Sequence, residues 1–258
     1  MKIIVCIKQV PDTETKIQLT DDKKDILKNN IKWIINPYDE FAIEEALKIK
    51  ESLGSGKVSL LSLGPKDRVK DALRTGLAMG ADEGIVIDTE EPLDYFASAK
   101  ILAQYIQNHL QDFQLILTGK LAIDDNNFSV GQAIAQFLEI PHVTNITKLQ
   151  TENDTFTVER EIEGGAKEIF QVKGPAIFSA NKGLNTPRYA TVKGIMMAKR
   201  KPLTEISLSE VGTSVEPLSL FEHFELPKER PEVRFLEGEP QEQAKTLVNL
   251  LRNEAKVI

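Results

Sequence analysis

The 258-residue chain contains one cysteine, one tryptophan and only 6% aromatic residues. A single cysteine, Cys6, excludes an internal disulfide and favours a reducing compartment. Lys and Arg total 32 against 39 Asp and Glu, and the net charge of -7 argues against nucleic acid as a main partner. No apolar run approaches the length of a membrane span, and the opening MKIIVCIKQV lacks the features of a signal peptide. We expect no direct membrane insertion.

Catalytic and metal signatures are scarce as well. Neither GxGxxG nor GxxxxGKS occurs, which disfavours an ordinary dinucleotide or Walker site. His109, His142 and His223 lack metal-ligand spacing to another histidine or to a cysteine. Cys6 lies in an apolar run, where a small buried hydrophobe is the better interpretation than a nucleophile. The sequence therefore predicts no metal site and no catalytic residue, and favours a binding protein over an enzyme.

Short apolar runs alternate with amphipathic segments along the first 140 residues. Apolar runs predict strands, and apolar residues spaced by three or four predict helices. Strands separated by helices of this size indicate an α/β fold with a mainly parallel sheet and helices on both faces. The predicted strands cover 2–7, 57–63, 85–87 and 115–117, and the predicted helices cover 39–53, 65–80 and 92–110, with a further helix starting near 131.

The pattern changes after Pro141. Segments 142–150, 155–160 and 167–172 alternate in polarity and predict a small antiparallel extension, after which 176–180 resumes a buried strand. Proline recurs from Pro202 onward, so we predict an extended arm over 203–239 and a terminal helix over 241–256. The predicted domains are an α/β domain, residues 1–200, and a C-terminal arm and helix, residues 201–258. The arm is expected either on a partner subunit or back on its own domain.

The run from Leu115 to Gln136 is the most informative stretch of the chain. A strand is followed by Thr118-Gly119, two adjacent carboxylates and a helix start. In open α/β sheets ligands bind beyond the carboxyl ends of strands, and a helix N-terminus there suits a phosphate. A plain strand-to-helix connection explains the local pattern equally well. Asp124 and Asp125 form a metal or acid/base pair, or they serve as caps and backbone acceptors, which is the better interpretation.

Two other runs are candidates for binding. Pro37 holds Asn36 extended, so the turn before Asp39 either contacts a ligand or only starts a helix. The run 187–195 precedes two methionines and three basic residues, which suit docking of an acidic or apolar partner; a solvated helix end is the competing interpretation. The residues of this second cluster are Met196, Met197, Lys199, Arg200 and Lys201.

Seven motifs in order resemble the electron transfer flavoprotein β subunits. They are VCIKQVPD (5–12), INPYDEFAIEEALKIKE (35–51), SLGP (62–65), LRTGLAMGADEGI (73–85), TGKLAIDD (118–125), VEREIEGG (158–165) and LNTPRYATVKGIMMAKRK (184–201). The resemblance implies an adenine nucleotide α-hydrolase-like fold, a structural AMP, and a heterodimer whose α subunit holds most of a redox-active FAD. It also implies electron transfer from acyl-CoA or related dehydrogenases to a membrane quinone oxidoreductase. The implied location is the bacterial cytoplasm, or the mitochondrial matrix in a eukaryote.

The same resemblance assigns roles to individual residues. Thr13 and Tyr38 are expected near FAD, and Glu161 is expected to make an intersubunit ion pair. Val192, flanked by Lys193 and Ile195, is the expected anchor for dehydrogenases, in a place where the family usually has leucine. Because Val192 lies between Pro187 and Gly194, we expect it at the tip of a loop, with internal packing as the alternative. The expected AMP-site residues are Cys6, Asn36, Pro37, Tyr38, Asp39, Leu63, Gly119, Ala122, Ile123, Asp124, Asp125, Asn126, Asn127, Phe128, Ser129, Val130 and Gly131.

One departure from the family pattern keeps alternatives open. Phe128-Ser129-Val130-Gly131 stands where many AMP-binding members have Asn-Gln-Thr-Gly, and Val130-Gly131 is slightly closer to the electron-bifurcating branch. That branch carries a second FAD in this pocket and oxidises NADH. VEREIEGG and PRYATVKG are similar to the non-bifurcating branch, which we favour. A nucleotide sensor of the universal-stress type is a third alternative, but it gives no role to the arm or to the run 187–201.

Overall fold

The computed structural model describes residues 1–90, 92–213, 215–230 and 232–258. The strands and helices, in chain order, are β1 (Lys2–Cys6), β2 (Gln9–Pro11), β3 (Trp33–Ile35), α1 (Pro37–Leu53), β4 (Lys57–Gly64), α2 (Lys66–Met79), β5 (Glu83–Asp88), α3 (Tyr95–His109), β6 (Leu115–Gly119), α4 (Val130–Leu138), β7 (His142–Glu152), β8 (Thr155–Glu161), β9 (Lys167–Lys173), β10 (Ala176–Ala180), α5 (Val192–Ala198), β11 (Leu203–Ser207) and α6 (Pro240–Asn253). Short 3-10 turns follow β8 (Glu163–Gly165) and β11 (Leu208–Val211).

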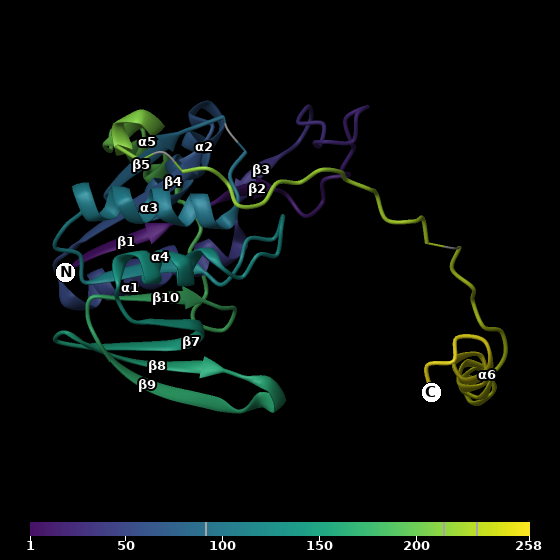
Figure 1. The fold of residues 1–258 in the computed structure, drawn as a ribbon. Coiled ribbons are helices and arrows are strands. Elements are labelled where there is room, and N and C mark those ends of the chain that lie inside the picture. The colour runs from purple at the N-terminus through teal and green to yellow at the C-terminus, as the bar shows by residue number, and fades with distance from the viewer. Residues whose placement is uncertain (91, 214, 231) are drawn as a thin grey trace.

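One large sheet carries the fold, with strand order β11-β5-β4-β1-β6-β10-β7-β8-β9 (Figure 1). Neighbours from β11 through β7 are parallel, and β8 and β9 continue the sheet antiparallel at one edge. The predicted α/β class and mainly parallel sheet are confirmed. The predicted antiparallel extension is also present, and it is joined to the main sheet because β7 pairs in parallel with β10.

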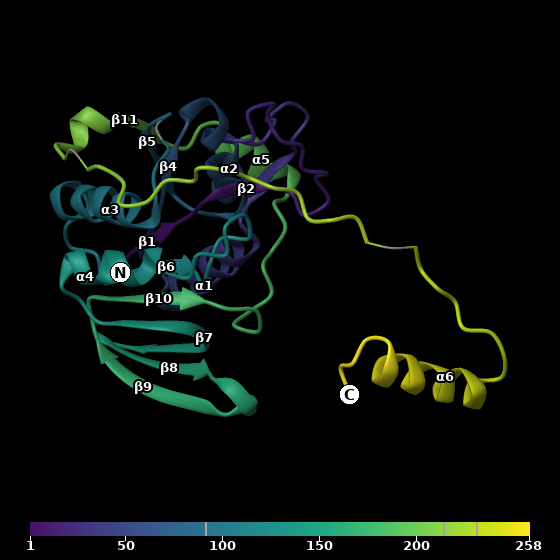
Figure 2. The same ribbon diagram turned by 45° about the vertical axis from the view of Figure 1, so that its right-hand side comes forward.

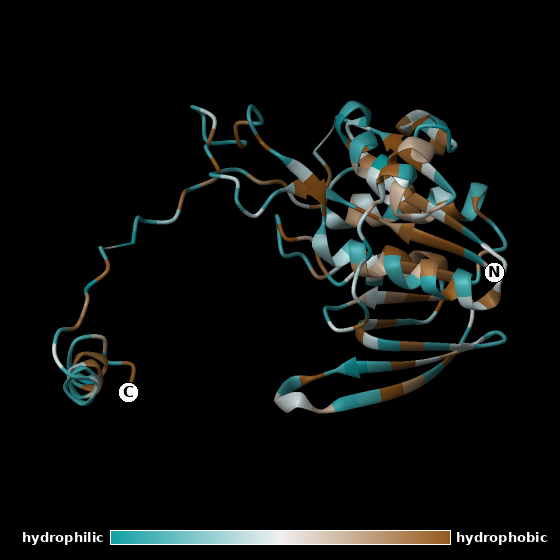
Figure 3. Ribbon diagram, turned by 180° about the vertical axis from the view of Figure 1, so that it is seen from behind, coloured by the Kyte–Doolittle hydropathy of each residue, from teal (hydrophilic) through white to brown (hydrophobic). Residues whose placement is uncertain are grey.

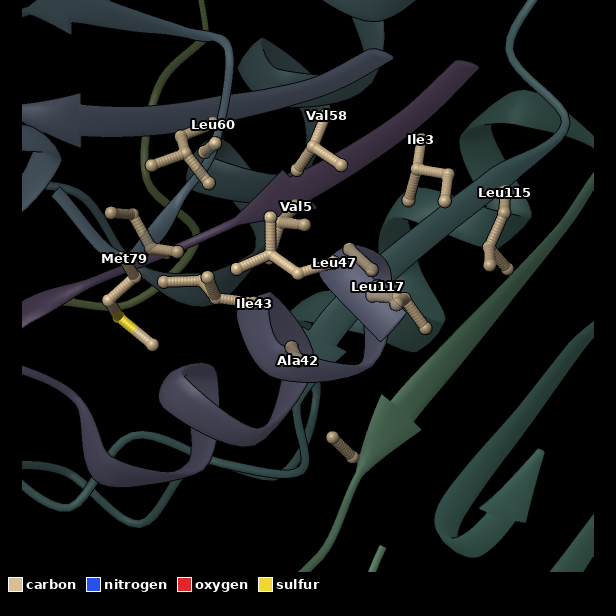
Figure 4. Close-up of a cluster of buried hydrophobic side chains, with 14 of the residues drawn as sticks. Ile3, Val5, Ala42, Ile43, Leu47, Val58, Leu60, Met79, Leu115 and Leu117 are labelled. Atoms are coloured by element: carbon tan, nitrogen blue, oxygen red, sulfur yellow. The ribbon is translucent and has the colours of Figure 1, made fainter. Parts of the chain in front are cut away.

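The central strands are mainly apolar because both faces of the sheet are covered by helices. Successive residues of a strand point to opposite faces. Ile3 and Val5 of β1 therefore pack in the cluster with α1 and α2 (Figure 4), whereas Ile4 and Cys6 pack with α3 and α4. The core is thus two layers of apolar side chains, one on each side of the sheet.

The strand order reverses beside β1. After β1 the chain proceeds through β4 and β5 on one side, and then returns to place β6 on the other side of β1. Such a switch point leaves a crevice beyond the carboxyl ends of the two central strands, and ligands of open α/β sheets bind there. The topology therefore selects the β1 and β6 ends as the first place to examine.

A separate two-stranded antiparallel sheet, β2 with β3, follows directly from the end of β1. Val10 faces Ile34 in this sheet, and the segment between the strands protrudes from the domain (Figure 1). The periodicity analysis does not predict this pairing. It places the short strand β3, with Trp33, immediately before the turn that starts α1.

The C-terminal arm starts later than predicted. Leu203–Ser207 is not extended arm but the edge strand β11, paired in parallel with β5. Beyond the 3-10 turn the chain first contacts the domain, through Val215 on the core and through the Leu218 and Ser219 N–H groups, which donate to Asp94. The Phe224 N–H donates to the Lys23 carbonyl (2.8 Å). The helix α6 lies apart from the sheet in both views (Figures 1 and 2). None of the α6 residues is buried, and the helix carries hydrophobic and hydrophilic residues (Figure 3). No helix in the described part of the chain is long and apolar enough to cross a membrane.

Candidate functional site

The carboxylate of Asp39 joins the ends of the two strands that flank the switch point. Its Oδ2 accepts a hydrogen bond from the Lys8 N–H (2.7 Å), and its Oδ1 accepts one from the Gly119 N–H (2.8 Å). The side chain is buried, and burial raises the pKa of Asp39 to about 7, against the hydrogen bonds from Lys8, Asn36 and Gly119 that lower it. Because both oxygens already bind backbone groups, Asp39 positions the site.

Asn36 makes the second connection across the crevice. Its Nδ2 donates to the Leu121 carbonyl (2.8 Å), and its Oδ1 accepts from the Ile123 N–H (3.2 Å). Its own N–H donates to the Lys8 carbonyl (2.9 Å). Pro37 is the first residue of α1, so the predicted Asn-Pro turn both starts the helix and holds the loop after β6.

Gly119 is required by a close approach of β6 to α1. A Cβ at this position would lie 2.3 Å from Asp39 Oδ1 and 2.7 Å from the Tyr38 Cβ. The strand end and the helix start can therefore approach this closely only with a glycine at position 119.

The adjacent carboxylates of the loop are paired with a lysine that the sequence interpretation did not select. Lys8 Nζ lies 2.9 Å from an Asp124 carboxylate oxygen and 3.1 Å from Asp125 Oδ2. Burial lowers the pKa of Lys8, but Asp124 and Asp125 outweigh it, so that pKa is raised. The position of Lys8, two residues after the end of a buried strand, is the signal that could have identified it. Of the described residues, no group of three or more His, Cys, Asp and Glu side chains could hold a metal ion.

The loop then turns into α4. Asn126 adopts a left-handed conformation (φ 52), and the Asn127 N–H donates to Asp125 Oδ1 (2.9 Å). Ser129 precedes α4 but its side chain caps nothing, so the N–H groups of the first turn remain available to an anion. Gly131 is packed against the sheet, because a Cβ there would lie 3.0 Å from Thr118 Oγ1.

The other residues expected at the AMP site lie near the same strand ends or in the loop before α4. Cys6 is the last residue of β1 and is buried, and burial, with the nearby charge of Asp39, raises the pKa of its thiol to about 12. Leu63 lies near the end of β4 and is half-buried. Lys120 Nζ lies 4.9 Å from the centre of the Tyr38 ring. Ala122, Ile123 and Phe128 lie in the loop before α4, and the Phe128 side chain is exposed.

Two predicted residues lie outside this set of contacts. Thr13 is exposed in the segment between β2 and β3, where its hydroxyl donates to Asp12 Oδ1 (3.4 Å). Glu161 is the last residue of β8, and its carboxylate makes no ion pair with any residue that the structure describes. A hollow of about 410 Å³ lies in the segment 12–32, and it includes none of the expected AMP-site residues.

Val192, Lys193 and Ile195 occupy the start of α5, on the flank of the molecule formed by α2. Val192 is 77% exposed and Ile195 is 50% exposed. The sequence interpretation places Val192 at a loop tip, but it is the first residue of a helix, capped by the Thr191 side chain, which accepts from the Gly194 N–H (3.0 Å). Internal packing of Val192, the competing interpretation, is wrong.

The basic cluster that follows α5 is smaller than predicted. Lys201 Nζ donates to the carbonyls of Leu77 (2.9 Å) and Ala81 (2.5 Å) at the C-terminal end of α2. Burial lowers the pKa of Lys201. Its charge is therefore used within the domain, and Lys199 and Arg200 are the exposed members of the cluster.

The segment that leads into α5 is fixed to α1 by ion pairs. Arg188 bonds to Glu44 (2.8 Å) and Glu51 (2.5 Å), and these carboxylates, Glu51 first, raise its pKa. Asn185 donates to the Phe41 carbonyl (2.9 Å). The exposed start of α5 is thus held on a rigid base.

Comparison with known proteins identifies the family. Residues 25–211 match the model described as the electron transfer flavoprotein domain. The chain belongs to this family. It is 41% identical to the electron transfer flavoprotein subunit beta of Bacillus subtilis, with 100% of both chains covered. It is 37% identical, again over 100% of both chains, to the mitochondrial subunit beta of Arabidopsis thaliana. The human subunit beta is 36% identical over 83% of this chain and 84% of its own length.

Membership of the electron transfer flavoprotein β-subunit family confirms the relationship that the seven motifs predicted. This family membership assigns the chain to electron transport. The relatives in the family include both bacterial and mitochondrial proteins. The carboxyl ends of β1, β4 and β6, the start of α1 and the loop before α4 hold the residues that the family resemblance marks for the nucleotide, whereas Thr13, Glu161 and Val192 lie elsewhere.

Proposed function

We propose that this chain is the β subunit of a heterodimeric electron transfer flavoprotein and binds AMP as a structural nucleotide. The observation that carries the nucleotide site is the convergence of Asn36 and Asp39 on the ends of β1 and β6 at the switch point. Residues far apart in sequence meet there, and the loop before α4 follows directly from β6.

The residues present suit an adenine nucleotide. Cys6 and Leu63 supply apolar surface at the strand ends, and the uncapped N-terminus of α4 supplies N–H groups and a favourable dipole for the phosphate. Backbone donors do not depend on the side chains at positions 128–130. The replacement of Asn-Gln-Thr by Phe128-Ser129-Val130 is therefore compatible with phosphate binding.

The redox chemistry belongs to FAD, held mainly by the α subunit, and this chain contributes position and electrostatics. Thr13 and Tyr38 approach that flavin in our proposal, and the exposed Glu161 carboxylate makes the intersubunit ion pair. No residue of this chain is assigned a catalytic role. We expect the complex in the bacterial cytoplasm, or in the mitochondrial matrix of a eukaryote.

Docking of acyl-CoA or related dehydrogenases is assigned to α5. Val192, Lys193 and Ile195 are exposed on it, and an apolar side chain beside a positive charge suits an anchor with steering charges at the rim. Electrons then pass from the complex towards a membrane quinone oxidoreductase.

The decisive test is the nucleotide content of the heterodimer purified with its α subunit. Denaturation should release FAD and AMP in equal amounts, measured by chromatography against standards. Release of two FAD per heterodimer would instead support the electron-bifurcating alternative with NADH oxidation. Release of ATP without flavin would contradict the proposal and support a nucleotide sensor.

A further inference from the structure

Arg68, in the first turn of α2, carries a buried hydrogen-bond donor with no partner. Its Nη1 is inaccessible to solvent and bonds to nothing in the described part of the chain. Buried polar atoms of native proteins almost always have a partner, and a charged donor is costly to leave unpaired. A ligand bound beside Arg68 could supply that partner.

The Arg68 side chain is held in place on one face. Its guanidinium carbon lies 3.8 Å from the centre of the Trp33 ring. Stacking on a ring leaves the N–H groups at the edge of the guanidinium available to a ligand. Gln9 Nε2 donates to the Arg68 carbonyl (2.8 Å), which fixes the backbone at the same point. Arg68 is thus a pre-positioned cation.

These contacts place Arg68 beside the switch-point crevice. Gln9 follows Lys8 directly, Trp33 lies in the strand that leads into Asn36, and α2 begins where β4 ends. Burial lowers the pKa of Arg68, while the charges of Glu90 and Asp124 oppose this, so the guanidinium is within electrostatic reach of the loop before α4.

The local charges leave Arg68 as a cation without a bonded carboxylate. Lys8, at the end of β1, is already paired with Asp124 and Asp125. Arg68 forms no salt bridge with any residue that the structure describes. For an anion bound at these strand ends, the charge of Lys8 is therefore already neutralised by carboxylates, whereas the charge of Arg68 is not.

We propose that Arg68, stacked on Trp33, binds the 5′-phosphate of the nucleotide held at the switch point. The assignment rests on the proposed nucleotide site and adds a side-chain determinant of its specificity. A guanidinium recognises phosphate through charge-assisted hydrogen bonds. Arg68 thereby distinguishes a nucleotide from its nucleoside. The same phosphate is present in AMP and in the adenylate part of FAD.

The test uses the heterodimer depleted of bound nucleotide and titrated calorimetrically with AMP and with adenosine. Arg68→Met should weaken AMP binding about ten- to a hundredfold and leave adenosine binding unchanged. Arg68→Lys, which keeps the charge but loses the planar fork, should retain part of the preference. Lys70→Met on the same helix removes a charge that pairs with Glu205 and should change neither affinity. If the extracted nucleotide is FAD at both sites, FAD and riboflavin replace AMP and adenosine.

An unchanged preference for AMP in Arg68→Met, in a complex with its normal FAD content, would overturn the assignment while leaving the nucleotide site intact. If Arg68→Met lowered the melting temperature but still preferred AMP over adenosine as wild type does, the only role of Arg68 would be to pack on Trp33. A wild-type complex that binds neither AMP nor FAD at the switch point would overturn the nucleotide site itself, and the role of Arg68 with it.

Discussion

At the scale of single residues, Asp39 connects the two strand ends at the site. One buried carboxylate holds the end of β1 and the end of β6 through backbone N–H groups, and it does so from the first turn of α1. Asp39 is therefore a residue that shapes the crevice, although the family resemblance grouped it with the AMP-site residues.

Asp39→Asn should destabilise the protein, because an amide NH₂ would face one of the two backbone donors. Leaving a buried N–H without an acceptor costs about 1–3 kcal/mol of unfolding free energy. Urea denaturation followed by circular dichroism measures this change. Asp67→Asn, an exposed aspartate in the first turn of α2, is the matched control and should cost much less. Equal effects of the two substitutions would contradict the role of the Asp39 carboxylate.

The same residue makes stability depend on pH. Burial raises the pKa of Asp39 from 3.8 to about 7, so the folded state binds this proton more tightly than the unfolded chain does. The resulting stabilisation is complete below about pH 4 and is lost as pH rises towards 7, by up to about 4 kcal/mol. The difference in stability between wild type and Asp39→Asn should thus be larger at pH 5 than at pH 8. A difference independent of pH would mean that Asp39 does not titrate in this range.

Gly119→Ala should be strongly destabilising for a steric reason. Its Cβ would lie 2.3 Å from Asp39 Oδ1, so the strand end or the helix start must move. We expect a loss of about 2–3 kcal/mol and a lower nucleotide content in the purified complex. Gly84→Ala in β5 is the control, because its Cβ would meet Leu73 and Leu77 at ordinary contact distances of 3.5 Å and more. Equal melting temperatures for the two variants would contradict the close approach.

At the scale of elements, α5 presents side chains that the domain does not need for its own stability. Val192, Met196 and Met197 are all more than half exposed. The helix is nevertheless well fixed, because a Cβ on Gly194 would lie 2.3 Å from the Ala78 carbonyl oxygen of α2. A fixed helix with an exposed apolar surface is an arrangement suited to docking.

Val192→Ala should lower the rate of electron transfer from an acyl-CoA dehydrogenase about tenfold, since truncating an interface anchor costs on the order of 1–2 kcal/mol. The melting temperature and the flavin content should not change, because Val192 is 77% exposed. The dehydrogenase-coupled rate and a thermal melt are measured together. Ile169→Ala on β9, a residue 68% exposed at the opposite edge of the sheet, is the control. A coupled rate equal to that of wild type would remove α5 from the docking surface.

At the scale of the whole molecule, the arm makes the isolated chain incomplete. Its apolar residues are exposed, including Leu220 (68%), Phe221 (74%), Val233 (77%) and Phe235 (86%). The arm is tied to the domain near its start, where Leu218 and Ser219 donate to Asp94, the residue that caps α3. Beyond that point it extends away from the sheet (Figure 2).

The chain expressed alone should associate, because exposed apolar surface promotes self-association. A variant ending at Ser219 keeps the contacts with Asp94 and removes the exposed apolar residues. Size-exclusion chromatography with light scattering should show a monomer for this variant and larger species for the full chain. The shortened variant should also fail to co-purify with the α subunit. A monomeric full chain that retains stoichiometric FAD would contradict this view of the arm.

The sequence by itself determined the helices and buried strands of the α/β domain, because their apolar periodicity is local. It also predicted that the motifs at 36–39 and 118–131 lie at one edge of the sheet, where the structure brings Asn36 and Asp39 into contact with the end of β6 and the loop after it. The loop carboxylates Asp124 and Asp125 were assigned to backbone bonding, and the structure adds Lys8 as their ion-pair partner.

Only the tertiary structure decided which distant groups meet. The edge strand β11 has a weak pattern of its own and forms because β5 offers it backbone partners. The sequence places Lys201 in an exposed basic cluster, whereas in the structure its Nζ donates to carbonyl groups at the end of α2. The orphaned donor of Arg68 has no signature in sequence, because satisfaction of a hydrogen bond depends on everything that surrounds the atom. Local periodicity fixes elements, whereas partners of polar groups are set by contacts between residues that lie far apart along the chain.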